Sequence, residues 1–390
     1  MATGTAPDCL WIDTDEGLAR LADELARAGE FAVDTESDGF HHYFDKLCLL
    51  QISTRHRNYV VDPLNVSSLA PLRAVLEDPD LPTVLHAAEQ DLMYLRRDHD
   101  IKVGGLFDTL VGAQFIGHTR LGLANILAEY FGLELSKSNQ LDDWSRRPLN
   151  EKQLRYAVGD TDHLLALRDR LATRLQDLGR QTWAAEECEA LMSRDAPPQR
   201  GEMDDVTRVK GWNDLSPRGR VILQELMRVR DREARRRDRP AFRVVGNAVL
   251  LALVAKPPTT VDEVRQVKGF PRQARGRLAE RLLAAVSAGL SRPESTFPPD
   301  PRRRLRRTLP ARHPRFDRRL EHLRRWRKKT ATGLDLPPGV VTPQRDLERL
   351  AGTRLQTIAD LHQLTDIRAW RRREFGAAWL EQLREGDDGA

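Results

Sequence analysis

Apolar and polar positions along the first half of the chain predict strands that alternate with helices. Short apolar runs in FAVDT, LCLLQIS, NYVVD and TVLHA predict buried strands, whereas LADELARAG and EQDLMYLRRDH carry the three-to-four-residue spacing of amphipathic helices. Helical spacing recurs near residues 68–77 and at 108–116, 121–131 and 151–178. Residues 1–190 are therefore expected to form a mixed sheet with flanking helices.

Beyond a polar, proline-containing stretch at 195–205, the chain contains an internal repeat. Shifting the sequence by 97 residues aligns LMRVRDREARRRDRP with LRRWRKKTATGLDLP, and TTVDEVRQVKGF with QTIADLHQLTDI. The offset holds over roughly 60 residues, which chance helical periodicity rarely achieves. We therefore expect two copies of a small helical domain, at 214–290 and 318–386. The segment 191–213 is expected to be a linker, and 291–317 a basic, proline-rich linker.

Charge divides the chain into two halves of opposite sign. Residues 1–200 carry 21 Lys and Arg against 33 Asp and Glu, a balance of −12. Residues 201–390 carry 42 against 25, a balance of +17, and 302–329 alone holds 14 basic and two acidic residues. An acidic half joined to a basic half suits an enzyme that acts on a polyanion such as nucleic acid. An arginine-rich solvated surface is the alternative explanation.

Composition and motifs exclude several other classes of protein. A chain of 390 residues that is 40% hydrophobic and 31% charged is expected to form two or three globular domains. No apolar stretch approaches 18 residues, and the first residues lack the pattern of a secretory signal. Cys9, Cys48 and Cys188 are too widely spaced for a disulfide framework. No phosphate-binding G-x-x-x-x-G-K-[ST] loop is present, which excludes an ATP-driven motor. A cytoplasmic protein is expected.

Acidic residues in three segments supply the candidate chemistry. Asp34 and Glu36 end the apolar run FAVDTE, so a strand would place both carboxylates on one face. Tyr156 and Asp160 are four residues apart in YAVGD and would share one face of a helix. Asp91 lies in the helical pattern EQDLMYL. Carboxylates brought together repel one another and need a divalent cation. Taken singly, each segment could equally be a helix cap or a solvated surface.

Taken together, in this order and with these apolar flanks, the segments resemble the ribonuclease D family of DEDD-type 3′→5′ exonucleases. The subclass is the one whose last motif is Tyr-x-x-x-Asp. The stretch KSNQLDDWSRRPLNEKQLRYAVGDTDHLL is also similar to that family, and the two repeats resemble its HRDC modules (helicase and ribonuclease D C-terminal). The resemblance covers nearly the whole chain. It implies an α/β ribonuclease H-like exonuclease domain followed by two all-α HRDC-type domains.

The resemblance also implies two divalent cations, Mg²⁺ or Mn²⁺, in an all-oxygen site. It implies that Asp34 bridges both ions, that Glu36 and Asp160 help hold the ion that activates water, and that Asp91 serves the second ion through coordinated water. Tyr156 would orient the attacking water, because a phenol with a pKa of about 10 is a poor base at neutral pH.

Further residues are candidates for weaker roles. Lys137, Trp144 and Arg147 could line the substrate path, with arginine on phosphate and tryptophan stacked on a base. Core packing accounts for Trp144 equally well. His86 ends an apolar strand and is expected to be packed rather than to bind metal, and Asp108 is expected to cap a helix.

These observations predict a monomeric exoribonuclease that removes mononucleotides from RNA 3′ ends, in tRNA 3′ processing or in the maturation of structured RNA. The same chemistry on DNA is an alternative, because the choice of sugar depends on contacts to the 2′-hydroxyl. A non-catalytic RNA-binding adaptor is a third hypothesis, and the complete motif counts against it. If the basic half captures RNA through phosphates, deleting residues 206–390 should weaken binding more than it slows chemistry.

Overall fold

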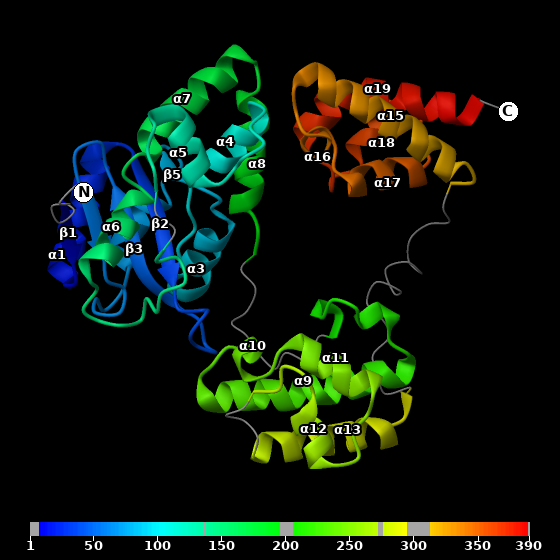
Figure 1. Cartoon of the computed structure of the whole chain (residues 1–390). Coiled ribbons are helices and arrows are strands. Elements are labelled where there is room, and N and C mark those ends of the chain that lie inside the picture. Colours follow the sequence, from blue (N-terminus) through cyan, green and yellow to red (C-terminus); the bar gives the residue numbers. More distant parts are fainter. Residues whose placement is uncertain (1–7, 136–137, 196–205, 272–275, 295–312, 389–390) are drawn as a thin grey trace. The chain divides into compact units, whose positions relative to one another are not determined.

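The computed structural model shown in Figure 1 contains two compact units. The described parts of residues 1–37, 47–197 and 310–390 form the first unit, and those of 38–46 and 198–309 form the second. Lys137 and the basic segment 295–312 lie outside the described residues. The structure describes residues 8–135, 138–195, 206–271, 276–294 and 313–388.

A six-stranded mixed sheet forms the centre of the first unit. The strand order is β1-β4-β3-β2-β5-β6, in which the pairs β2–β3 and β3–β4 are antiparallel and the other pairs are parallel. The predicted strands all form. The strands are β1 (Cys9–Ile12), β2 (Phe31–Ser37), β3 (Leu47–Ser53), β4 (Asn58–Val61), β5 (Thr83–Leu85) and β6 (Leu106–Asp108).

Helices flank this sheet on both sides. The pattern at 151–178 predicts one continuous helix, but the structure divides it into two helices, with the break at Asp160–His163. In the described ranges, no helix is both long enough and apolar enough to cross a membrane. The helices are α1 (Asp15–Ala28), α2 (Arg73–Leu76), α3 (Glu89–His99), α4 (Thr109–Phe115), α5 (Leu123–Phe131), α6 (Glu151–Gly159), α7 (Leu164–Asp177) and α8 (Gln181–Met192).

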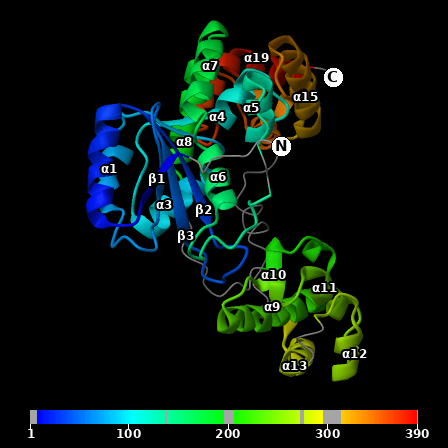
Figure 2. The same ribbon diagram turned by 60° about the vertical axis from the view of Figure 1, so that its left-hand side comes forward.

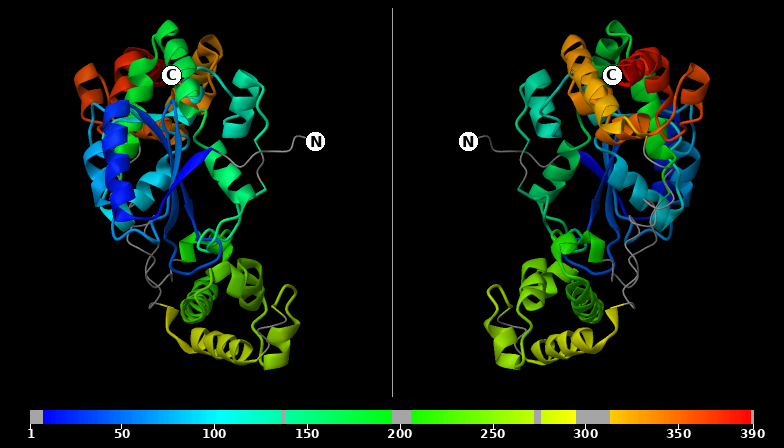
Figure 3. Two further views of the ribbon diagram at one scale, coloured as in Figure 1. Left: turned by 90° about the vertical axis from the view of Figure 1, so that its left-hand side faces the viewer. Right: turned by 90° about the vertical axis from the view of Figure 1, so that its right-hand side faces the viewer.

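The alternation of side chains along β2 determines which helices cover which face of the sheet. Phe31 and Val33 share a hydrophobic core with residues of α1, α2 and α3. Ala32 points to the opposite face and packs with residues of α4, α5 and α7. Figures 2 and 3 show α1 and α6 on opposite sides of the sheet. Because alternate residues of a strand share a face, Asp34 and Glu36 lie on the same face as Ala32.

The remaining helices form two copies of one module, as the repeat predicts. In the second copy, α16 and α17 cover the same positions as α10 and α11 in the first, shifted by 97 residues. Single contacts repeat as well: Arg230 donates to the carbonyl of Val245, and Arg327 donates to that of Thr342. The first module contains α9 (Pro217–Arg237), α10 (Ala241–Val244), α11 (Asn247–Ala255), α12 (Val261–Gln266) and α13 (Arg277–Ser291). The second contains α15 (Phe316–Leu334), α16 (Pro338–Val341), α17 (Gln344–Gly352), α18 (Ile358–His362) and α19 (Ala369–Asp388).

The second module shares a hydrophobic core with the sheet domain inside the first unit. Trp183 of α8 stacks on Trp370 of α19, with ring centroids 4.6 Å apart and an interplanar angle of 17°. Next to this stack, Glu187 forms an ion pair with Arg371 at 2.6 Å. Arg180 donates to the carbonyl of Leu334 at 2.7 Å. Aromatic stacking and buried ion pairing therefore join two segments that lie far apart in the sequence.

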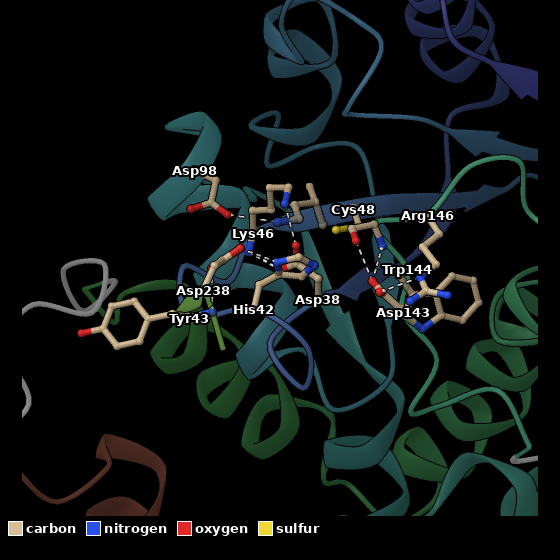
Figure 4. Close-up of polar contacts among 12 residues, drawn as sticks. Asp38, His42, Tyr43, Lys46, Cys48, Asp98, Asp143, Trp144, Arg146 and Asp238 are labelled. Atoms are coloured by element: carbon tan, nitrogen blue, oxygen red, sulfur yellow. Dashed lines mark hydrogen bonds and ion pairs between the residues drawn. The ribbon is translucent and has the colours of Figure 1, made fainter. Parts of the chain in front are cut away.

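The first module belongs to the second unit and holds the loop 38–46, which connects β2 to β3. Tyr43 is buried, and its hydroxyl donates to Asp231 at 2.7 Å. The backbone N–H of Tyr43 and the ring Nδ1 of His42 both contact the carboxylate of Asp238, at 3.0 and 2.6 Å. Within the loop, Lys46 forms an ion pair with Asp38 (Figure 4). The loop that follows Ser37 is thus part of the module that begins some 170 residues later in the sequence.

Candidate active site

Asp34 and Glu36 lie near the end of β2, on the strand pair at the centre of the sheet. Asp34 is directly opposite Gln51 of β3, and Glu36 is opposite Leu49. The register of the pair shifts between Glu36 and Ser37, so regular pairing ends just beyond the second acid. Both carboxylates are only partly buried. The strand geometry therefore presents two acids on one face of the sheet, close to the end of the regular pairing between β2 and β3.

Helix α6 brings Tyr156 and Asp160 to the same face. The helix begins with a capping box, in which Asn150 accepts from the backbone of Gln153 and the side chain of Gln153 accepts from the backbone of Asn150. It ends with Asp160 as its C-cap. The Thr161 hydroxyl then forms a hydrogen bond of 2.6 Å with Ser53 of β3. This contact fixes the end of α6 against the strand that neighbours β2.

Three of the predicted acids meet at this place. Asp34, Glu36 and Asp160 each offer one carboxylate oxygen, and these atoms all lie within 4.8 Å of one another. The strand supplies two of the oxygens and the helix end supplies the third. Such a set of oxygen atoms matches the ligands that hard divalent cations prefer. We call these three residues the carboxylate cluster.

Asp91 reaches the site from α3, which packs on the opposite face of the sheet. Its Oδ1 accepts a hydrogen bond of 2.5 Å from the hydroxyl of Thr35, the residue between the two acids of β2. Among the described residues Asp91 is not one of the acids within 4.8 Å of each other. Its charge still acts on the cluster, because it raises the pKa of Asp34. Thr35 therefore holds the fourth acid beside the other three.

Asp108 fixes the turn that leads into α3. Its two carboxylate oxygens accept from the backbone N–H groups of Ala87 and Ala88, each at 2.9 Å. Ala87 adopts a left-handed conformation with φ of 60°, which this double contact stabilises. Asp108 also caps α4 by accepting from Leu110, as predicted. The Nδ1 atom of His86 lies 2.9 Å from the Thr109 hydroxyl, and burial lowers the pKa of its ring.

Burial and mutual repulsion disfavour the charged forms of the clustered acids. Burial raises the pKa of Glu36 to about 9, with Asp160 and Asp91 adding to the effect. Burial likewise raises the pKa of Asp91 to about 7 and that of Asp160 to about 6. The pKa of Asp34 is raised well above its ordinary value by burial and then by Asp91. A divalent cation would reverse these shifts, because it stabilises the ionised carboxylates.

Tyr156 lies beside the carboxylate cluster and can act there as a hydrogen-bond donor. Burial, followed by the charges of Asp160 and Glu36, raises the pKa of its phenol well above the ordinary value. The hydroxyl therefore keeps its proton at neutral pH and can donate a hydrogen bond but cannot act as a base. The ring packs near Trp144, with centroids 5.9 Å apart. This packing limits the rotation of the ring.

Trp144 and Arg147, two candidates for substrate contact, are both engaged in contacts within the protein. Trp144 is fully buried and packs with core residues of β3, β4 and α6, so core packing accounts for it and its ring is not open to a base. Arg147 forms a two-pronged ion pair with buried Asp62, at 2.6 and 2.7 Å, and donates to the carbonyl of Cys48. Its guanidinium therefore holds the segment before α6 onto the sheet.

Sequence reasoning missed two residues of the site. Thr35 positions Asp91, and Gln51 lies across from Asp34 with its side chain fully buried. Gln51 could have been found, because it interrupts the otherwise apolar run LCLLQI. Thr35 carries no such signal, since threonine is ordinary in a strand.

Comparison with known proteins agrees with this geometry. Residues 9–176 match the family described as 3′-5′ exonuclease, and residues 220–286 and 316–383 each match the HRDC domain. The fold and the carboxylate cluster together define a 3′–5′ exonuclease with two HRDC modules, which confirms the expected fold class.

Similarity to individual proteins extends along the whole chain. The chain is 32% identical over 378 residues to ribonuclease D of Gluconacetobacter diazotrophicus, covering 95% of this chain and 91% of that protein. It is 33% identical over 267 residues to the exosome complex exonuclease RRP6 of Saccharomyces cerevisiae, covering 65% of this chain and 36% of that protein. The crystal structure of Escherichia coli RNase D aligns with a TM-score of 0.71 at 25% identity, over 97% of this chain and 99% of that one. The chain belongs to the ribonuclease D family.

Proposed function

We propose that this chain hydrolyses RNA one nucleotide at a time from the 3′ end and releases 5′-mononucleotides. The observation that carries the proposal is the carboxylate cluster, whose three oxygen atoms lie within 4.8 Å beside the protonated phenol of Tyr156. Family membership supports the reaction. The related Escherichia coli enzyme is described as an exoribonuclease involved in structured RNA processing.

The cluster fits divalent cations, because its donors are all carboxylate oxygens and burial disfavours their charges without a counter-charge. Two such ions, Mg²⁺ or Mn²⁺, would supply electrostatic stabilisation of the attacking and leaving oxygens. Asp34, Glu36 and Asp160 would hold these ions, with Asp91 beside them as the fourth acid. These assignments follow the family pattern.

The protein's own groups divide the remaining work. Tyr156 donates a hydrogen bond that orients the attacking water, since its raised pKa keeps the proton on the phenol. Thr35 fixes the orientation of Asp91 through its short hydrogen bond. Asp108 holds the turn from which α3 starts. The cluster is thereby preorganised by neighbouring hydrogen bonds, which is what an electrostatic catalytic site requires.

The substrate proposal rests on the charge of the second half. A balance of +17 over residues 201–390 favours a polyanion, and RNA is the polymer named in the description of the related Escherichia coli RNase D. We propose tRNA 3′ ends or other structured RNA as the physiological substrate. We further propose that the enzyme acts as a cytoplasmic monomer.

Digestion of end-labelled oligonucleotides tests the proposal. A 5′-labelled single-stranded RNA incubated with Mg²⁺ or Mn²⁺ should shorten in single-nucleotide steps, and a tRNA precursor should lose its 3′ trailer. Asp34→Asn and Asp160→Asn should each reduce the rate by at least about 10³-fold. Full activity in either variant would overturn the site.

The matched control is Asp162→Asn, because Asp162 is an exposed acid two residues from Asp160 and bonds to Asn58 instead of joining the cluster. That variant should keep wild-type activity. DNA of the same sequence provides the second arm. Faster digestion of the DNA than of the RNA would replace the proposed substrate with DNA, and tight binding without cleavage of either would indicate an adaptor.

A further inference from the structure

The first helical module carries a concentration of arginines around one buried carboxylate. They line a pocket of about 380 Å³ formed where the C-terminal end of α9 meets the N-terminal end of α13. Arg277 and Arg281 are four residues apart on α13 and share one face of that helix. We call this feature the arginine pocket. It consists of Glu233, Arg236, Arg237, Arg277 and Arg281, with Gly276 and Leu278 at its edge.

Glu233 orders three of these arginines. Its carboxylate accepts from Arg236 at 2.7 and 3.1 Å, from Arg237 at 2.5 Å and from Arg281 at 2.8 Å. The Glu233 side chain is only 2% exposed, whereas those of Arg236 and Arg281 are 61% and 50% exposed. Because each guanidinium carries five N–H donors, the contacts with Glu233 hold the three cations in place and use only a minority of their donors.

The charges of the pocket do not balance. Three guanidiniums around one carboxylate leave a surplus of two positive charges. Arg277 is exposed and adds a third, since no ion-pair partner for it occurs among the described residues. The first backbone N–H groups of α13 lie at the same edge, and Gly276 provides no side-chain cap for them. Guanidinium groups held in place and the N–H groups at a helix N-terminus are donors that bind phosphate.

The internal repeat shows that the module does not need this pocket in order to fold. At the offset of 97 residues, the second module replaces Glu233, Arg236 and Arg237 with Thr330, Gly333 and Leu334. It likewise replaces Arg277 and Arg281 with Glu374 and Ala378. The second module nevertheless forms the same set of helices. The five charges of the first copy are therefore not needed for this arrangement of helices.

From this we infer that the arginine pocket of the first module is a binding site for a backbone phosphate of the RNA substrate. The inference rests on the proposed function for the identity of the polymer, and it assigns the phosphate contact to the first of the two modules. A phosphate contact does not distinguish one sugar or base from another. The pocket would therefore add affinity and help to position the RNA strand without a preference for its sequence.

Substitutions taken from the second module test the inference without threatening the fold. Arg277→Glu and Arg281→Ala install the residues found at the equivalent positions of the second copy. Arg265→Glu on α12 is the control for charge reversal within the same module, because Arg265 is paired with Asp262 and lies outside the pocket. All variants carry Asp34→Asn, so that binding is measured without digestion.

The measurement is fluorescence anisotropy of labelled single-stranded RNA and of DNA with the same sequence, at several salt concentrations. Arg277→Glu should weaken binding of both polymers about tenfold relative to Arg265→Glu. Each lost phosphate contact should also reduce the slope of log Kd against log salt by about 0.7. Arg281→Ala should show the same trend, and Arg277→Lys should retain most of the slope.

Two results would overturn the inference. One is an affinity and a salt slope for Arg277→Glu that equal those of Arg265→Glu. The other is calorimetric binding of pyrophosphate that Arg277→Glu abolishes while RNA affinity stays unchanged, which would make the pocket a site for a small free anion. Because binding is measured in a catalytically inactive background, its outcome is independent of whether the wild-type chain digests RNA or DNA.

Discussion

Gln51 lies directly across from Asp34 on the neighbouring antiparallel strand, and its amide is completely buried. Among the described residues neither its Oε1 nor its Nε2 has a hydrogen-bond partner. A buried amide without partners costs about 1–3 kcal/mol of stability. Because this amide lies beside Asp34, we expect it to have a role in the site.

Replacing Gln51 with leucine should therefore have opposite effects on stability and turnover. We expect Gln51→Leu to raise the melting temperature of the metal-free protein, because an unsatisfied amide becomes an apolar side chain of similar size. Turnover at saturating RNA should fall at least tenfold with little change in KM, because the group beside Asp34 is lost. Thermal melting in EDTA and initial rates test both parts. Lower stability with unchanged turnover would show that Gln51 is only a packing residue.

The raised pKa values of the acids predict how metal-free stability depends on pH. Glu36, Asp91 and Asp160 have folded-state pKa values of about 9, 7 and 6, above those expected in the unfolded chain. The folded protein thus retains protons that the unfolded chain has released, so stability should decrease as pH rises from about 4 to about 9. Melting curves in EDTA across this range test the sign.

Two comparisons isolate the cluster as the source of that slope. Glu36→Gln should flatten the upper part of the curve, between about pH 7 and 9, because the Glu36 carboxyl, whose pKa is raised to about 9, is no longer there to ionise. Added Mg²⁺ should raise the melting temperature most at high pH, where the carboxylates are free of protons. A metal-free protein that becomes more stable with rising pH would contradict the assignment.

Tyr156→Phe distinguishes a hydrogen-bond donor from a general base. Because the raised pKa keeps the phenol protonated, we expect the variant to lose about 10²-fold in turnover while the shape of the pH–rate profile is preserved. Binding of RNA should hardly change. Rates measured from pH 6 to 9 decide the matter, since loss of a rising limb in the variant would mean that the tyrosine itself titrates.

The stacked pair Trp183 and Trp370 predicts that the nuclease domain and the second module unfold together. Trp370→Ala should cost about 3–5 kcal/mol, because it empties a fully buried position at the centre of a shared aromatic core. Calorimetry should show one lowered transition that contains both parts. The control is Trp212→Ala, because Trp212 belongs to the hydrophobic core of the first module, and this variant should lower a different transition.

The strand period accounts for how much of the site could be predicted. Alternation fixed the shared face of Asp34 and Glu36, and the helical repeat of 3.6 residues placed Asp160 one turn beyond Tyr156. The short hydrogen bond between Thr35 and Asp91 could not be predicted, because it joins a strand and a helix whose bonded residues are 56 positions apart in the sequence. The break between α6 and α7 was also missed, because Gly159 is a single glycine inside a helical spacing that resumes at Leu164.

The internal repeat predicted the two modules but not their different attachments. Trp370 has the spacing of an ordinary core residue within its own helix, and nothing local shows that it stacks on Trp183. Similarly, His42 and Tyr43 lie in a short loop whose contacts with Asp238 span nearly 200 positions of sequence. Long-range packing of this kind depends on the tertiary arrangement, and local patterns do not encode it.

The shared core of the sheet domain and the second module changes how this protein can be dissected. A chain cut after the nuclease domain would expose Trp183 and Phe115, which the second module buries. We expect such a truncated enzyme to be poorly soluble, so its RNA affinity could not be measured. Deletion of residues 206–390 therefore cannot separate binding from chemistry. The second module covers apolar residues of the catalytic domain. Point substitutions confined to the first module are therefore the better test of how the basic half contributes to RNA binding.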